Sequence, residues 1–230
     1  MQAVILAAGR GTRMKELTES VPKPMLTVDG VTLLHHKLAE LPEAVDEVIF
    51  VIGYHGEKIR EAFGESHEGK KVSYVIQDTL DGTAGALWKA KEILRDRFLV
   101  MMGDDLYGRE DLVAAAEWTD WVIGVAETEP GAGGRVHIDD AGKVMDIVEG
   151  KHAESGLTST NLFALDTRLF SFPLIPKAEG SDEYGLPQTV LAASNTGSIP
   201  LHALTASFWY QVTTPEDLAA ATDALAKRAR

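Results

Sequence analysis

Short, uninterrupted apolar segments alternate with amphipathic segments through the first half of the chain, and few folds accommodate that order. Segments such as Glu47–Ile52 and Phe98–Met102 are typical of strands buried on both faces. Segments such as Leu33–Leu41 carry leucines at helical spacing. The pattern predicts an α/β fold whose mainly parallel sheet is flanked by helices. The expected strands are Ala3–Leu6, Glu47–Ile52, Val72–Ile76, Phe98–Met102 and Trp121–Ala126, and the expected helices are Leu33–Leu41, Glu57–Phe63, Ala84–Leu94 and Asp111–Glu117.

The pattern changes near Gly131. Val136–Ile138 and Val144–Val148 flank a turn with the sequence DDAG, which predicts an antiparallel hairpin. Asn161–Leu165 and Ser198–Ala203 are expected strands, and Pro215–Lys227 is an expected closing helix. With no repeat and no linker, residues 1–230 are expected to form one domain with a small antiparallel insertion.

Composition excludes several classes of partner. The net charge of −13 argues against binding to nucleic acid or an anionic membrane. The absence of cysteine excludes disulfides and thiolate metal sites. The first apolar stretch, about six residues, is too short for a signal peptide or a membrane span. We therefore expect a cytoplasmic protein with small-molecule partners, for which a homo-oligomer is compatible with the sequence.

The loop after the first strand has features of a phosphate-binding turn. In parallel sheets ligands bind beyond the carboxyl ends of the strands. Gly9 and Gly11 allow close backbone approach, and Arg13 offers a permanently charged donor. A plain tight turn is the alternative interpretation. A dinucleotide fingerprint would need glycine where Met14 stands, and no Walker A sequence is present.

Lys23 stands between Pro22 and Pro24, whose rings restrict the backbone around it and disfavour helix. A lysine on so stiff a segment is presented to a ligand, although an isolated Pro-Lys-Pro sequence would favour a solvated loop lysine.

The segments LAAGRGTRM and VPKPML, at this spacing, closely resemble the opening signature of the sugar-1-phosphate nucleotidyltransferases, or NDP-sugar pyrophosphorylases. Among these, glucose-1-phosphate thymidylyl- and uridylyltransferases are the most similar types. The resemblance is close over Met1–Asp105 and looser to the end of the chain. It implies a Rossmann-like fold with a nucleotide-binding half, 1–130, and a sugar-binding half, 131–230. It also implies transfer of a nucleoside monophosphate from a triphosphate to a sugar 1-phosphate, with release of pyrophosphate (EC 2.7.7.-).

The resemblance assigns roles by position. Arg13 would hold the leaving phosphates, and Lys23 would stabilise charge at the α-phosphate. Asp104 completes the catalytic set as the Mg²⁺ ligand. The nucleotide-binding residues would be Leu6, Ala8, Gly9, Gly11, Thr12, Gln77, Gly82 and Thr83.

Two carboxylates, Asp104 and Asp105, follow the strand Phe98–Met102 and suit a Mg²⁺ anchor, with a helix-capping turn as the alternative. The segment WYQVTTP resembles the family's W-x-D-I-G-T-P, whose aspartate commonly supplies a second metal ligand. Gln211 occupies that position, so its neutral amide would be the weaker second ligand.

The sugar-side residues implied by the resemblance are Gly134, Glu149, Lys151 and Asn161. Gly150 interrupts the usual Glu-Lys-Pro pattern, and Asn161 stands where glycine is expected.

Gln77, with both donor and acceptor atoms, could bind the edge of a pyrimidine, although the segment that follows it is by itself typical of a plain helix start. This segment resembles the family's nucleobase-reading segment, and with the LAAGRGTRM form the resemblance implies UTP or dTTP before CTP. Glucose 1-phosphate is the default sugar substrate. A catalytically weak or inactive nucleotide-sugar-binding regulatory subunit is the alternative, because of Gln211. A nicotinamide-dependent dehydrogenase is disfavoured by Met14.

Overall fold

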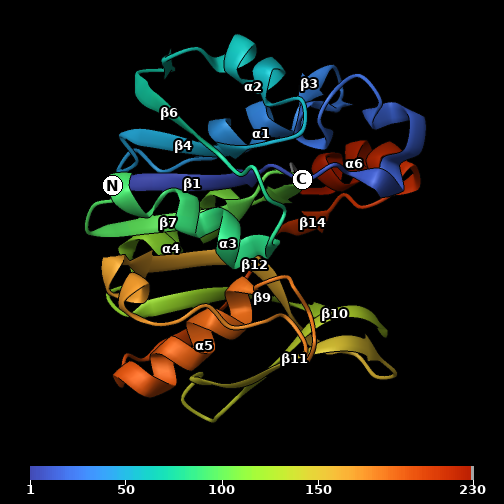
Figure 1. The fold of residues 1–230 in the computed structure, drawn as a ribbon. Coiled ribbons are helices and arrows are strands. Elements are labelled where there is room, and N and C mark those ends of the chain that lie inside the picture. Colours follow the sequence, from blue (N-terminus) through green and yellow to red (C-terminus); the bar gives the residue numbers. More distant parts are fainter. Residues whose placement is uncertain (229–230) are drawn as a thin grey trace.

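The computed structural model describes residues 1–228 and shows a single mixed sheet of ten strands flanked by helices (Figure 1). This confirms the predicted α/β class. The sheet order is β11-β10-β12-β7-β1-β4-β6-β5, with β9 pairing β12 and β13. These strands are β1 (Gln2–Ala7), β4 (Glu47–Ile52), β5 (Ser66–His67), β6 (Lys70–Ile76), β7 (Arg97–Met102), β9 (Trp121–Thr128), β10 (Gly131–Ile138), β11 (Val144–His152), β12 (Gly156–Asp166) and β13 (Leu201–Thr205).

Helices cover both faces of the sheet, and β1 shows how the sequence divides between them. Val4 and Leu6 belong to an apolar cluster with α3 and α5, whereas Ala3 and Ile5 belong to one with α1, α2 and α4. Side chains alternate between the two faces of a strand, so a continuous apolar run fills two cores. The helices are α1 (Leu33–Ala39), α2 (Gly56–Phe63), α3 (Gly82–Lys89), α4 (Arg109–Glu117), α5 (Leu186–Gly197) and α6 (Pro215–Arg228). None of these, within residues 1–228, combines the length and the apolar character that crossing a membrane requires.

The second half departs more from expectation. The predicted hairpin is present as β10 and β11, but both strands are longer than expected. The expected strand Ser198–Ala203 begins later, at Leu201. The helix expected to reach Leu94 ends at Lys89, and a short 3₁₀ turn, η3 (Lys91–Ile93), follows it. Helix α5 was not predicted, because only its apolar face against β11 and α3 distinguishes it.

Smaller elements connect the sheet to the site. The β2–β3 pair and the 3₁₀ segments η1 and η2 follow the first strand, and a separate antiparallel pair joins β8 to β14. Helix α6 packs against η1 and β2, which brings the end of the chain beside the glycine loop. The bounds are η1 (Thr12–Thr18), η2 (Lys23–Met25), β2 (Thr27–Val28), β3 (Val31–Thr32), β8 (Asp105–Tyr107), η4 (Thr167–Ser171) and β14 (Trp209–Gln211).

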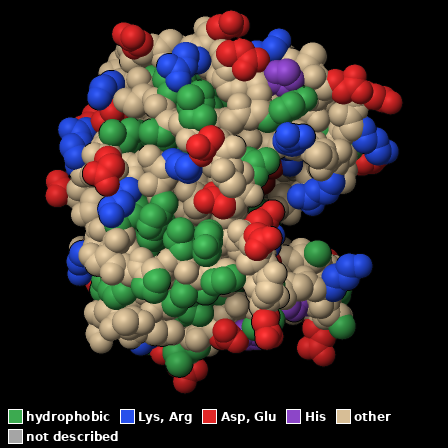
Figure 2. All heavy atoms as spheres, viewed as in Figure 1, with side chains coloured by type: hydrophobic (Ala, Val, Ile, Leu, Met, Phe, Trp, Pro, Cys, Tyr) green, Lys and Arg blue, Asp and Glu red, His purple; other side chains and the backbone are tan. Residues whose placement is uncertain are grey.

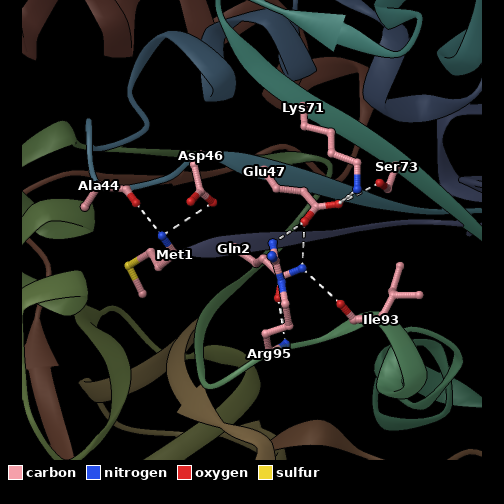
Figure 3. Close-up of polar contacts among 9 residues, drawn as sticks. All are labelled: Met1, Gln2, Ala44, Asp46, Glu47, Lys71, Ser73, Ile93 and Arg95. Carbon is pink, nitrogen blue, oxygen red and sulfur yellow. Dashed lines mark hydrogen bonds and ion pairs between the residues drawn. The ribbon is translucent and has the colours of Figure 1, made fainter.

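A cluster of charged and polar side chains connects the amino-terminal ends of β1, β4 and β6. The Glu47 carboxylate on β4 accepts hydrogen bonds from Lys71 (2.8 Å) and Ser73 (2.7 Å) on β6. It also accepts from Gln2 on β1 (2.8 Å) and from Arg95 (2.7 Å), as Figure 3 shows. Burial alone raises the pKa of Glu47, but these hydrogen bonds outweigh it and lower the pKa to about 2. The cluster lies away from the ligand-binding edge and stabilises the fold.

Candidate active site

The loops that follow β1 and β7 meet at the carboxyl end of the sheet. The two strands pair in parallel, and the Gly103 amide donates a hydrogen bond to the Leu6 carbonyl at 2.9 Å. The glycine loop and the segment that carries Asp104 therefore lie side by side. This adjacency follows from the sheet order, as expected from the sequence.

Lys23 and Asp104 form an ion pair at this junction. Lys23 Nζ lies 2.5 Å from Asp104 Oδ2, and the side chains are 7% and 26% exposed. The prediction that the two prolines keep Lys23 out of helical structure is wrong. Pro22 is extended and Lys23 begins the one-turn η2, because a proline fits the first turn of a helix.

Gly11 explains how the glycine loop reaches the lysine. Its φ of +63° is left-handed, and a Cβ here would lie 2.8 Å from the Cβ of Lys23. The Thr18 hydroxyl donates to the Gly11 carbonyl at 3.2 Å, and Met14 is fully buried below the loop. Any other residue at position 11 would push the loop away from Lys23.

Two adjoining cavities occupy this end of the molecule. The larger, here called the main cleft, has a volume of about 510 Å³ and reaches from the glycine loop to the β10–β11 hairpin. The smaller, here called the side pocket, has a volume of about 230 Å³ and contains Lys23 and Asp104. Leu6, Gly9, Arg13 and Met102 line both. Figure 2 shows the surface hollowed between the hairpin and the α6 side of the molecule.

Nearly all of the predicted site residues line these cavities. Those in the main cleft are Leu6, Ala8, Gly9, Arg13, Gln77, Gly82, Thr83, Gly134, Glu149, Asn161 and Gln211. Those in the side pocket include Gly11, Thr12, Arg13, Lys23 and Asp104. Lys151 is the exception, because it is exposed and lines neither cavity.

The backbone at Asn161 explains its identity. Asn161 has φ +55°, at a point where the pairing of β9 with β12 is irregular between Ser159 and Phe163. Glycine adopts this left-handed conformation most easily, and asparagine tolerates it better than most residues. An asparagine can therefore stand where the family resemblance predicts glycine, while its amide lines the cleft.

Gly134 makes room for Glu149. The two residues pair across the hairpin, and a Cβ at position 134 would lie 2.9 Å from Glu149 Oε1. Gln188 Nε2 on α5 donates to the same oxygen at 3.4 Å. The glycine thus allows the carboxylate to lie in the cleft.

Two charged residues of the main cleft, Lys177 and Glu183, were not predicted, because no motif surrounds them in the sequence. They lie on the loop before α5, where the Lys177 amide donates to the Glu183 carbonyl at 2.8 Å. Their side chains lie 3.9 Å apart. Among residues 1–228, Arg13 and Lys177 are the only lysines or arginines that line this cleft. The cation on the side of the cleft next to the β10–β11 hairpin and α5 therefore comes from this loop.

Gly82 and Thr83 hold that loop in place. The Tyr184 amide donates to the Asp81 carbonyl at 2.7 Å, and Tyr184 accepts from the Ala84 amide at 3.1 Å. A Cβ at Gly82 would lie 2.3 Å from the Tyr184 carbonyl oxygen. The Leu186 amide donates to the Thr83 hydroxyl at 2.9 Å. These two residues line the cleft and also join its two halves.

A buried polar network supports Asp104 from below. Lys37 on α1 donates to the Asp105 carbonyl and lies 4.7 Å from the centre of the Tyr107 ring. The Asp105 carboxylate accepts from Trp209 Nε1 at 3.1 Å. Burial lowers the pKa of Lys37 and raises that of Asp105, whose neighbour Asp104 raises it further. The sequence did not suggest that a lysine would be buried here.

The oxygen atoms of Asp104 and Gln211 could bind a hard cation such as Mg²⁺ only if a bound substrate supplied further ligands. No group of three or more His, Cys, Asp or Glu that could hold a metal occurs within residues 1–228. Asp104 offers a carboxylate in the side pocket, and Gln211 offers an amide oxygen in the main cleft. Mg²⁺ commonly takes one or two protein oxygens and fills its remaining positions with phosphate and water, so the residues fit.

Comparison with known proteins agrees with this geometry. A family profile described as Nucleotidyl transferase matches residues 2–228. The bifunctional protein GlmU of Methanocaldococcus jannaschii is 32% identical over 79% of this chain and 43% of its own length. The UTP–glucose-1-phosphate uridylyltransferase AglF of Haloferax volcanii is 28% identical over 83% of this chain and 82% of its own.

The solved structures support the fold. A putative glucose-1-phosphate thymidylyltransferase from Bacillus anthracis superimposes with a TM-score of 0.84, at 22% identity, over 97% of this chain and 94% of the other. The chain spans less than half the length of the GlmU proteins that it matches first.

Proposed function

The chain belongs to the nucleotidyl transferase family of enzymes (EC 2.7.7.-), and we propose that it transfers a nucleoside monophosphate to a sugar 1-phosphate with release of pyrophosphate. One observation carries the proposal. Arg13 and Lys23 lie ten residues apart on the connection after β1 and Asp104 follows β7, yet the three residues line two adjoining cavities at the carboxyl end of the sheet. We further propose that residues 1–130 bind the nucleotide and residues 131–230 the sugar.

The side pocket is the proposed place of the triphosphate. Phosphoryl-type transfer needs positioning and charge stabilisation, and the protein forms no covalent bond. Arg13 would hold the β- and γ-phosphates, with the turn at Gly9, Gly11 and Thr12 beside them. Lys23, buried and fixed by the prolines, would stabilise the charge that develops at the α-phosphate.

In the reaction, a phosphate oxygen of the sugar 1-phosphate attacks the α-phosphorus. The bond from that phosphorus to the oxygen of the β-phosphate breaks, and pyrophosphate leaves with the bonding electrons. Asp104, with Gln211 as the weaker donor, would hold Mg²⁺, which when bound neutralises phosphate charge. Lys23 must then release Asp104 in part, since the two now form a 2.5 Å ion pair.

The sugar would lie between the β10–β11 hairpin and α5. Glu149 and Asn161 would bind hydroxyl groups, with Gly134 leaving space for them. Two lysines are candidates for the sugar phosphate. Lys177 lines the cleft, whereas Lys151 lies on the hairpin outside it. We favour Lys177, because a phosphate beside the carboxylates of Glu149 and Glu183 needs a cation within the cleft itself.

UTP or dTTP is the proposed nucleotide and glucose 1-phosphate the proposed sugar substrate. Leu6, Ala8, Gln77, Gly82 and Thr83 line the main cleft and would surround the base. The relative AglF carries a name that specifies UTP and glucose 1-phosphate, and it aligns over most of both chains.

A nucleotide-sugar-binding regulatory subunit is the second candidate. Gln211 brings no charge to the metal, and Asp104 is already paired with Lys23. Such a protein would bind the product nucleotide sugar without turnover.

Pyrophosphate release with Mg²⁺, four nucleoside triphosphates and a panel of sugar 1-phosphates tests the proposal. Turnover that requires both substrates supports the transferase. Binding of a nucleotide sugar, with no pyrophosphate release from any pair, would support the regulatory subunit instead. A Lys23→Ala protein with normal release would remove the role proposed for Lys23.

A further inference from the structure

The side-chain amide of Gln77 is held by two acceptors at once. Its nitrogen, Nε2, donates to Asp81 Oδ1 at 2.8 Å and to the Gly82 carbonyl oxygen at 3.1 Å. An amide nitrogen carries two hydrogens, so both are used. The side chain is almost fully buried, yet it lines the main cleft.

The chemistry of these partners fixes the orientation of the amide. A carboxylate and a carbonyl can only accept hydrogen bonds. If the Gln77 amide were reversed, its oxygen would face both of them and no hydrogen bond would form. Asp81 therefore locks the amide with its carbonyl oxygen, Oε1, as the atom left for a ligand. Within residues 1–228, Oε1 has no hydrogen-bond partner, and it is not sealed from solvent.

An acceptor at this position selects among bases. Uracil and thymine carry an N–H at ring position N3, which can donate to Oε1, whereas N3 of cytosine carries a lone pair. A cytosine in the same place would set acceptor against acceptor. We propose that Asp81, by orienting Gln77, is the positioning residue that makes the cleft select uracil and thymine nucleotides over cytosine nucleotides. This rests on the proposed function, whose nucleotide site it refines.

Gly85, one turn further along α3, makes the lock sterically feasible. A Cβ at position 85 would lie 2.1 Å from Asp81 Oδ1, and its three nearest atoms would all belong to the Asp81 carboxylate. Gly85 itself lines neither cavity. The carboxylate occupies the space that the missing side chain leaves, and the Tyr184 amide holds the Asp81 carbonyl at 2.7 Å. A glycine inside a helix is less stable than an alanine, so Gly85 lowers the stability of α3 while it leaves space for the Asp81 carboxylate.

The test compares UTP, dTTP and CTP in the wild type and in an Asp81→Asn variant. An asparagine can offer either its oxygen or its nitrogen to Gln77, so in the variant only the Gly82 carbonyl still favours the original orientation of the amide. We expect the wild type to prefer UTP or dTTP, and the UTP-to-CTP ratio of kcat/KM to fall by about tenfold to a hundredfold in the variant. Affinity for the sugar phosphate should stay the same.

Asp78→Asn is the matched control, because Asp78 lies on the same loop but is exposed and paired with Lys89. It should leave the ratio unchanged. Gly85→Ala is a second route to the same effect, since its methyl group would displace the Asp81 carboxylate, and it serves if Asp81→Asn does not fold. Equal losses for all three nucleotides in Asp81→Asn, or a wild type that prefers CTP, would overturn the proposal.

Equilibrium binding of UTP and CTP, measured without the sugar phosphate, separates this inference from the proposed function. If no pyrophosphate is released but UTP binds more tightly than CTP in the wild type and not in the variant, the transferase assignment fails and the role of Asp81 stands. If turnover is normal and base preference is the same in both proteins, the role of Asp81 fails and the transferase stands.

Discussion

Replacing Glu47 with glutamine should destabilise the fold by an amount that depends on pH. The Glu47 pKa of about 2 lies well below its ordinary value of 4.5, because hydrogen bonds from Lys71, Ser73 and Gln2 outweigh the effect of burial. The carboxylate is only 5% exposed, whereas its partners Lys71 and Arg95 are 69% and 66% exposed, so the stabilisation inferred from its pKa is an upper bound. A decrease in the Glu47 pKa from 4.5 to about 2 on folding adds about 3 kcal/mol to the free energy of unfolding at neutral pH.

The sign follows from linkage. A carboxyl group whose pKa is lower in the folded state stabilises the fold above its unfolded pKa, and that stabilisation is lost as pH falls toward the folded pKa. The Glu47→Gln variant has no such titration and leaves Arg95 facing an amide. The difference in unfolding free energy should therefore be at most about 3 kcal/mol near pH 7 and should shrink steadily between about pH 4.5 and pH 2.

Urea denaturation of both proteins at several pH values measures this difference. Glu43→Gln, a nearby exposed glutamate without a hydrogen-bond partner among residues 1–228, is the matched control and should change stability by less than about 0.5 kcal/mol. A Glu47→Gln difference that is equally small near pH 7, or that stays constant as the pH falls, would refute the account of the cluster.

Three further predictions concern the site. Lys177→Met should raise the KM for the sugar 1-phosphate by about tenfold and leave that for the nucleotide unchanged, whereas Lys151→Met should change neither; steady-state kinetics showing the reverse would assign the phosphate to the hairpin. Lys23→Met should lower kcat by about a hundredfold or more, with folding unchanged by circular dichroism, and a loss confined to KM would contradict its role in the transition state. Lys37→Ala should lower the unfolding free energy by about 3 kcal/mol, and Lys37→Met by less, because methionine keeps the packing on Tyr107 and removes a buried charge; denaturation curves in the opposite order would refute this.

The sequence determined the sheet and the loops that carry the proposed phosphate site. Strands such as Glu47–Ile52 can be predicted from their apolar runs, because the pattern of a buried strand involves residues that are next to each other in the chain. The turns at the glycine loop and at the Pro-Lys-Pro segment can be predicted for a similar reason, since glycine and proline affect the conformation of their own backbone. Parallel pairing then places the ends of β1 and β7 together, so the meeting of Lys23 with Asp104 could be foreseen.

Only the tertiary structure decided which side chains share the part of the main cleft where we propose that the sugar binds. Lys151 follows Glu149 on the hairpin, yet it is exposed and lies outside the cleft, while Lys177 enters from a loop without a motif. That loop is placed by Tyr184, whose backbone bonds to the start of α3. No local pattern records such a contact, because it joins segments that are distant in sequence.

The same distinction applies to Gln77. The family resemblance predicted a base contact for Gln77, but an amide can act as donor or acceptor, and the sequence does not say which. Asp81 and the Gly82 carbonyl settle the choice only once the chain turns into α3 and Gly85 leaves space for the carboxylate. Chain-local propensities determined the scaffold and the family of this protein; the orientation of polar groups in its cleft was decided by packing between segments, because a hydrogen bond depends on the position of both partners.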